Sequence, residues 1–167
     1  MDEERERTFL QWQDEHRGIV LKVARSYAVS HRDQEDLAQE ILIQLWFSID
    51  RFQGQAKAST WIYRVALNTA MAWQRGERRR RKRVEKLVEM DAYWLRRKNP
   101  ENELLSRLYE AIHQLPPHER SLVLLYLDDL KYAEIAEVVG ISESNVGVRI
   151  NRVKKKLSTL CNGGSDS

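Results

Sequence analysis

Hydrophobic residues recur with the period of an α-helix along nearly the whole chain, and no segment alternates in the way a strand does. Phe9, Trp12 and His16 predict a first helix, and the apolar positions within 19–27 predict a second. A predicted break at 28–33 precedes the next helical stretch. We therefore expect an all-α protein made of two small helical domains joined by a linker.

The predicted helix at 34–49 carries apolar groups on more than one side. Leu37 and Leu45 fall on one stripe, whereas Ile43 and Phe47 lie off that stripe. A helix with apolar groups on several sides is normally surrounded by neighbours, so we expect this helix to be central in its domain.

Residues 50–59 show no periodicity and contain Gly54, so they are predicted to form a loop. Either Ser59 or Thr60 is expected to cap the helix that follows. One face of that helix is expected to be buried: Ile62, Val65, Ala66, Thr69 and Trp73. A second face, here named the strand face, combines an aromatic ring, an amide, two guanidinium groups and a flexible apolar chain: Trp61, Arg64, Asn68, Met71 and Arg75.

The strand face is a candidate site for single-stranded nucleic acid, because these side-chain types grip unstacked bases and a phosphate strand. The preceding loop is polar and small enough to accept an extruded base: Gln53, Gly54, Gln55 and Lys57. The alternative is that Trp61 simply packs on a neighbouring helix. Six consecutive basic residues at 78–83 favour the nucleic-acid interpretation, although such a run can also serve only solubility or targeting.

Charge is unevenly distributed along the chain, although the formal net charge of +3 is small. Residues 1–50 hold 6 Lys/Arg and 11 Asp/Glu, residues 51–100 hold 14 and 4, and residues 101–167 hold 8 and 10. The chain thus has an acidic first part and a strongly basic middle. Such asymmetry indicates two different partner surfaces, one for nucleic acid and one for protein.

The last part of the chain predicts a helix-turn-helix. Beyond a break at Asn99-Pro100, three helical segments are expected: 103–115, 118–127 and 132–157. Within the last segment, Ala136, Gly140 and Val146 have the spacing of this motif. A small residue lets the two helices approach, glycine adopts the positive φ of the turn, and an aliphatic residue docks the second helix.

The second helix of the motif is expected to begin after Ser142 as its N-cap. Its inward stripe consists of Val146, Ile150, Val153 and Leu157. Its outward face is polar and basic: Ser144, Asn145, Val148, Arg149, Arg152, Lys154, Lys155 and Lys156. Recognition helices contact bases near their N-terminus and phosphates with their cations, which favours DNA binding over a hairpin that merely packs. Gly147 weakens the helix by about 1 kcal/mol relative to Ala, but its missing side chain would let the backbone lie close to DNA.

Several function classes are disfavoured. The four histidines show no metal-ligand spacing and no glycine-rich phosphate loop is present, so we expect no enzyme, no cofactor and no metal. Cys161 is the single cysteine, and no apolar run approaches the ~20 residues that would span a bilayer. Together with the missing signal peptide, these features predict a cytoplasmic protein. The charged first residues are expected to form a frayed helix entry, and residues 161–167 a disordered tail.

Three motifs resemble those of one known family: EDLAQEILIQLW at 35–46, STWIYRVALNTA at 59–70, and the helix-turn-helix segment at 115–157. In this order they resemble bacterial sigma factors of the extracytoplasmic-function (ECF) group, the minimal members of the sigma-70 family. The resemblance implies a region 2 domain at 1–83, a linker at 84–102 and a region 4 domain at 103–160.

The residue patterns and the resemblance together predict three groups of binding residues. Those for RNA polymerase are Asp36, Leu37, Gln39, Glu40, Ile43, Gln44 and Phe47. Those for the minus-ten promoter element are Phe52, Gln53, Gly54, Lys57, Ser59, Trp61, Arg64, Asn68, Met71, Arg75, Arg78 and Arg79. Those for the minus-thirty-five element are Ser142, Ser144, Asn145, Val148, Arg149, Arg152, Lys155 and Lys156.

The function implied by the resemblance is promoter-specific transcription initiation. The partners would be core RNA polymerase (through its largest-subunit clamp coiled coil and its flap), promoter DNA in duplex and single-stranded form, and an anti-sigma factor of the kind that inhibits many members. Ala58 departs from the family pattern, where many members carry a bulky aromatic residue, and this affects loop packing and base preference. A stand-alone helix-turn-helix regulator is the alternative, but it leaves the strand face and the acidic first part without a role.

Overall fold

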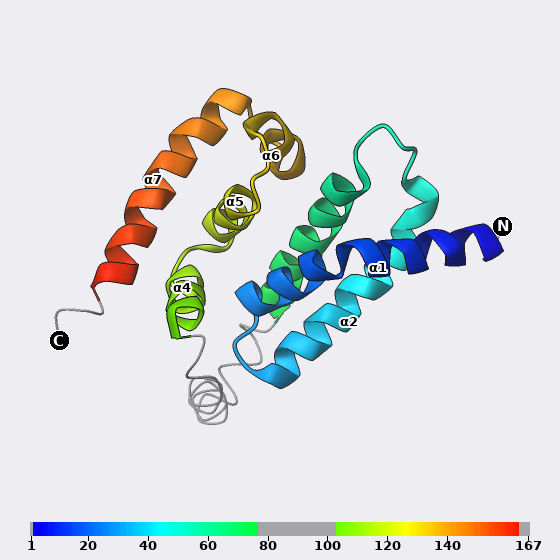
Figure 1. Ribbon diagram of the computed structural model, residues 1–167, viewed down its shortest axis with the longest axis horizontal. Coiled ribbons are helices and arrows are strands. Elements are labelled where there is room, and N and C mark those ends of the chain that lie inside the picture. The colour runs from blue at the N-terminus through cyan, green and yellow to red at the C-terminus, as the bar shows by residue number, and fades with distance from the viewer. Residues whose placement is uncertain (1, 77–102, 164–167) are drawn as a thin grey trace. The chain divides into compact units, whose positions relative to one another are not determined.

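The computed structural model describes residues 2–76 and 103–163, and within these ranges every regular element is a helix (Figure 1). Contacts divide the chain into two compact units, Met1–Ala92 and Tyr93–Ser167. The all-α fold class is therefore confirmed. The predicted linker, the basic run at 78–83 and residues 164–167 lie outside the described residues, so the exact domain bounds stay a prediction.

Helix α1 (Asp2–Tyr27) combines the first two predicted helices into one element. They meet at a kink, because His16 has non-helical backbone angles (φ −126°, ψ 19°). The expectation of a frayed entry is wrong: the helix starts at Asp2, and Arg5 is bonded to the backbone of Trp46. The acidic side chains of the first turn also favour helix at this end through the macrodipole.

Helix α2 (His31–Ser48) packs along α1 and is followed by the short 3₁₀ helix η1 (Ile49–Arg51). The Ser30 hydroxyl caps α2 by accepting a hydrogen bond from Asp33 N at 3.1 Å. The predicted apolar stripe is buried. The central position expected for this helix is wrong within the described residues, because Ile43 and Phe47 are 48% and 60% exposed.

A third helix of this unit covers residues 58–76 of the described chain. The Trp61 N–H donates to Lys57 O, so the helix begins before Ser59 and Thr60, and the prediction that one of these caps it is wrong. The buried side is also rotated from the predicted one and includes Ile62, Tyr63, Ala66, Leu67 and Ala70. The segment has apolar groups on several sides, so its periodicity fits more than one buried stripe.

The second unit contains four described helices: α4 (Glu103–His113), α5 (Pro117–Leu127), α6 (Tyr132–Val139) and α7 (Glu143–Asn162). Its core includes Ile112, Leu115, Val123 and Val153, which joins α4, α5 and α7. Pro117 opens α5, where its missing N–H costs no helical hydrogen bond. Helix α7 extends to Asn162, beyond the predicted end of the domain at residue 160.

No helix among the described residues is long and apolar enough to cross a membrane.

Candidate nucleic-acid interface

Three aromatic rings contact one another at the start of the loop that precedes the 58–76 helix. The Phe52 ring stands edge-on to Trp12, with centroids 5.3 Å apart, and tilted against Trp61 at 5.7 Å. Such pairs stabilise beyond the area they bury. Phe52, predicted to contact the minus-ten element, is thereby half-buried, and its ring is fixed by partners on both sides.

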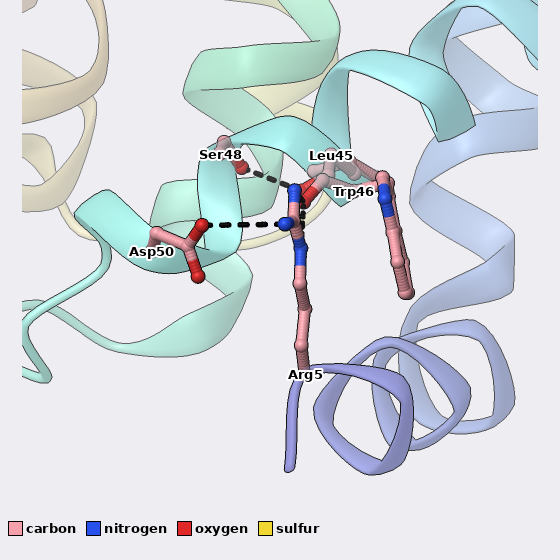
Figure 2. A network of polar contacts seen from close by, with 5 residues as sticks. All are labelled: Arg5, Leu45, Trp46, Ser48 and Asp50. Carbon is pink, nitrogen blue, oxygen red and sulfur yellow. Dashed lines mark hydrogen bonds and ion pairs between the residues drawn. The ribbon is translucent and has the colours of Figure 1, made fainter. Parts of the chain in front are cut away.

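Trp61 is half-buried and tied to the end of α2. Its Nε1–H donates to Ser48 Oγ at 3.1 Å. The buried Ser48 hydroxyl in turn donates to Leu45 O at 2.8 Å, a bond drawn in Figure 2. The packing alternative considered for Trp61 therefore describes part of its environment. The ring retains an exposed portion, so intramolecular packing and a role at the strand face are compatible.

The remaining minus-ten candidates form an exposed surface over the loop and the next helix. The structure exposes Gln53, Gly54, Lys57, Arg64, Asn68 and Arg75, and half-buries Ser59 and Met71. Gly54 has φ +72°, a backbone conformation that L side chains rarely adopt, and it turns the loop. Arg78 and Arg79 lie outside the described residues.

A groove of about 690 Å³ separates α2 from the 58–76 helix. Asp36, Glu40 and Gln44 line it from α2, and Asn68 and Trp73 line it from the opposite side. Gln44 Nε2 donates to Glu40 Oε1 at 3.0 Å, which orients that carboxylate along the helix. Predicted polymerase-binding and DNA-binding residues therefore adjoin one another on the same unit.

Most of the predicted polymerase-binding residues lie on the outer face of α2. Asp36, Gln39, Ile43, Gln44 and Phe47 are exposed, and Glu40 is half-buried. Leu37 is a correction, since its side chain is 0% exposed and belongs to the core. It supports this surface from beneath and cannot contact a partner directly.

The helix-turn-helix has the geometry predicted for it. Gly140 ends α6 with φ +75°, and Ser142 Oγ caps α7 by accepting from Asn145 N at 3.2 Å. Val146 and Ile150 are buried against the unit, as expected for the inward stripe. The opposite face of α7 is exposed: Ser144, Asn145, Val148, Arg149, Arg152 and Lys155.

Two lysines at the end of that face interact with α5. Lys156 Nζ lies 2.8 Å from Glu119 Oε1, so its charge is already paired, although it was predicted to contact DNA. Lys154 Nζ lies 4.8 Å from the centre of the Tyr126 ring, and its side-chain hydrogen bond with Tyr126 raises the pKa of Lys154 above its usual value. Arg149, Arg152 and Lys155 are therefore the better candidates for phosphate contacts.

Gly147 faces the protein rather than open space. A Cβ added there would stand 3.5 Å from Tyr132 Cε2, an ordinary van der Waals distance. Packing against Tyr132 therefore does not explain why this position is a glycine, and the expectation that it lets the backbone approach DNA stays a prediction.

Sequence reasoning missed the residues that hold helix ends together. Arg5 and Ser48 in the first unit, and Arg120 in the second, each donate to carbonyl oxygens near the end of a helix. The bond of Ser48 is local, three positions back in α2, but those of Arg5 and Arg120 span 41 positions and five to seven positions, so neither periodicity nor a capping pattern reveals them.

Comparison with known proteins identifies both units. A family model of sigma-70 region 2 matches residues 13–80, and one of sigma-70 region 4 matches residues 105–157. The ECF RNA polymerase sigma-E factor of Haemophilus influenzae is 31% identical over 141 residues, covering 77% of this chain and 75% of that protein. The chain belongs to the ECF group of the sigma-70 family.

Other members of the family agree with this. The ECF RNA polymerase sigma factor SigW of Bacillus subtilis is 29% identical over 142 residues, covering 75% of this chain and 73% of the relative. The structure of CnrH in complex with the cytosolic domain of CnrY has a TM-score of 0.65 at 27% identity and covers 97% of this sigma factor and 91% of CnrH. The sigma factor RpoE of Bartonella quintana, solved with the anti-sigma factor NepR, shares the fold with a TM-score of 0.63 at 17% identity.

Proposed function

We propose that this ECF sigma factor binds core RNA polymerase and directs transcription initiation by recognising minus-ten and minus-thirty-five promoter elements and opening the DNA. The observation that carries the proposal is the pairing on one chain of region 2 and region 4 matches with two exposed surfaces suited to DNA. One is the strand face with its loop, and the other is the outward face of α7.

The outer face of α2 is the proposed polymerase-binding surface. Ile43 and Phe47 supply exposed apolar groups beside the acidic Asp36 and Glu40. These two side chains are one helical turn apart on the same face, and adjacent exposed apolar side chains rimmed by polar ones are typical of interaction sites. The clamp coiled coil of the largest polymerase subunit is the proposed partner for this face, and the flap is the proposed partner of region 4.

The loop at 52–57 and the strand face are proposed to capture bases of the opened minus-ten strand. Unstacking a base costs a few kcal/mol, and contacts in a pocket offset that cost. Stacking on an aromatic side chain contributes about 1–3 kcal/mol for each base engaged. The half-exposed Trp61 and the exposed Asn68 and Arg64 provide ring, amide and cation for this task.

The outward face of α7 is proposed to enter the major groove at the minus-thirty-five element. Ser144 and Asn145 stand in its first turn, where side chains of recognition helices reach base edges. Arg149 and Arg152 follow on the exposed side and suit phosphate contacts.

Catalysis, cellular location and an anti-sigma partner also belong to the proposal. The protein acts without a catalytic group of its own, since RNA synthesis belongs to the polymerase. It works in the bacterial cytoplasm, where polymerase and promoter DNA are found. An anti-sigma factor is a further proposed partner, because the similar CnrH was solved with the cytosolic domain of a second protein.

Reconstitution tests the function directly. The purified chain is added to core RNA polymerase on fragmented genomic DNA, and transcript starts are mapped. We expect defined starts that require both components and share sequence elements upstream. If the chain instead binds one duplex sequence tightly by itself and adds no starts to core polymerase, it is a stand-alone regulator and the proposal fails.

A further inference from the structure

The first turns of α1 contact the segment that leads into the loop at 52–57, although residues 2–12 precede the region 2 match at 13–80. The guanidinium of Arg5 donates to Trp46 O from Nη2 at 2.9 Å and from Nε at 3.2 Å. Its Nη1 forms an ion pair with Asp50 Oδ2 at 3.3 Å, and Figure 2 draws this pair as a dashed line. One side chain from α1 thus joins the last turn of α2 to η1.

The contact suits the chemistry of a helix end. Carbonyl oxygens in the last turn of a helix lack intrahelical partners and carry partial negative charge, which a cation relieves. The planar guanidinium has enough donors to serve the carbonyl of Trp46 and the carboxylate of Asp50 together. It also lies 4.6 Å from the centre of the Trp46 ring, a cation–π distance.

A second contact from α1 holds Phe52, two positions after Asp50. Trp12 packs edge-on against Phe52, which directly follows η1, and Phe52 packs on Trp61. Both Asp50 and Phe52 are therefore fixed by α1. The exposed loop residues Gln53 and Gly54 begin immediately after this fixed point.

We propose that residues 2–12 of α1 form a brace that sets the position of the promoter-strand loop, with Arg5 as its positioning residue. The inference rests on the proposed function, because it assigns Arg5 a role in strand capture. A loop held at its base loses less conformational freedom when a base enters, so the brace raises affinity for the opened strand without touching DNA.

The test measures strand binding by preassembled holoenzyme. The probe is a fluorescent single-stranded oligonucleotide carrying the minus-ten element of a promoter mapped by reconstitution. Core polymerase is saturating, so a weaker polymerase contact through the nearby Phe47 cannot imitate the effect. We expect Arg5→Ala to weaken strand binding about tenfold, the size of one hydrogen bond to a charged group.

Matched variants separate positioning from charge and from unfolding. Arg7→Ala removes the same charge from an exposed site on α1 and should stay within about twofold of wild type. Arg5→Lys keeps the charge but lacks the planar set of N–H donors, so its strand affinity should lie between those of wild type and Arg5→Ala. Asp50→Asn, at a carboxylate whose side chain is 70% exposed, weakens the brace without threatening the fold and should also reduce strand binding.

All variants are assayed well below their melting temperatures. If Arg5→Ala and Arg7→Ala bind the strand equally well, the brace is overturned. If Arg5→Ala does not fold, Asp50→Asn decides instead: wild-type strand affinity in that variant would overturn the brace. A wild-type holoenzyme that binds no promoter strand would instead reject the proposed function.

Discussion

At the scale of single residues, two arginines do similar work in the two units. Arg5 donates to a carbonyl at the end of α2, and Arg120 donates to Leu115 O at 2.8 Å and to His113 O at the end of α4. Arg120 is only 7% exposed, and its hydrogen bond to Leu115 O is buried whereas that to His113 O is partly buried. Removing such a donor leaves buried acceptors unsatisfied, which costs more than an ordinary surface contact.

Arg120→Ala should therefore lower the stability of the second unit by about 2–3 kcal/mol, the usual cost of leaving buried polar groups unsatisfied. Thermal unfolding followed by circular dichroism measures the effect. Arg107→Ala is the control, because its side chain is 55% exposed and its ion pair with Glu103 is worth about 0.5 kcal/mol. Similar melting temperatures for the two variants would contradict this role of Arg120.

Asn68 offers a cleaner test of the strand face than Trp61. Trp61→Ala also removes the hydrogen bond to Ser48, so a loss of function would mix folding with DNA binding. Asn68 is exposed, and Asn68→Ala should leave the melting temperature nearly unchanged while reducing open-complex formation about tenfold, as expected for one lost hydrogen bond to a base.

Permanganate reactivity of unpaired thymines in the holoenzyme–promoter complex measures this opening. Gln11→Ala removes an exposed amide from α1 of the same unit and serves as the control. If the Asn68→Ala holoenzyme opens the promoter as well as wild type does, Asn68 does not contact the opened strand.

At the scale of elements, α2 shows how one helix serves two tasks. Leu37, Ile41 and Leu45 are fully or nearly fully buried, while Ile43 and Phe47 on other sides are exposed. The inner stripe fixes the helix in the unit. The outer side chains are then free to bind a partner without loss of the fold.

Ile43→Ala should weaken binding to core polymerase about tenfold, as truncation of a central apolar interface residue often costs more than 1 kcal/mol. Leu21→Ala is the matched control, since Leu21 is 51% exposed on α1, close to the 48% of Ile43. Fluorescence anisotropy of labelled variants against core polymerase gives both affinities. Equal affinities would place the polymerase contact elsewhere.

At the scale of the whole molecule, acidic and basic residues are separated along the chain. Acidic residues dominate the first fifty positions, and residues 51–100 hold 14 Lys/Arg against 4 Asp/Glu. Affinity for DNA that depends on such cations falls as salt rises, because each phosphate contact releases counterions. Binding through the apolar side chains of α2 should respond far less to salt.

Holoenzyme binding to duplex promoter DNA should therefore weaken steeply between low and moderate salt. If Arg149 contacts one phosphate, Arg149→Ala should reduce the slope of log affinity against log salt by about 0.9. Filter binding at several salt concentrations measures the slope, with Arg107→Ala as an exposed cation of the same unit that should leave it unchanged. An unaltered slope in Arg149→Ala would exclude that phosphate contact.

Much of the fold followed from local signals. The helical period, Gly140 with its positive φ and the Ser142 cap all act between residues close in sequence, and the helix-turn-helix was predicted from them together with Ala136 and Val146. Exposure of the α7 face followed as well, because a buried stripe on one side of a helix leaves the opposite side to solvent.

The sequence by itself determined that the regular elements of the described residues would be helices and which face of α7 would be exposed, because periodicity and capping depend on near neighbours. Only the tertiary structure decided that Leu37 is hidden, that Tyr63 and Leu67 face the core, and that Trp61 bonds Ser48. It alone joined Arg5 to Trp46, 41 positions away. Contacts of that kind depend on which helices meet and at what rotation, and no local pattern encodes either.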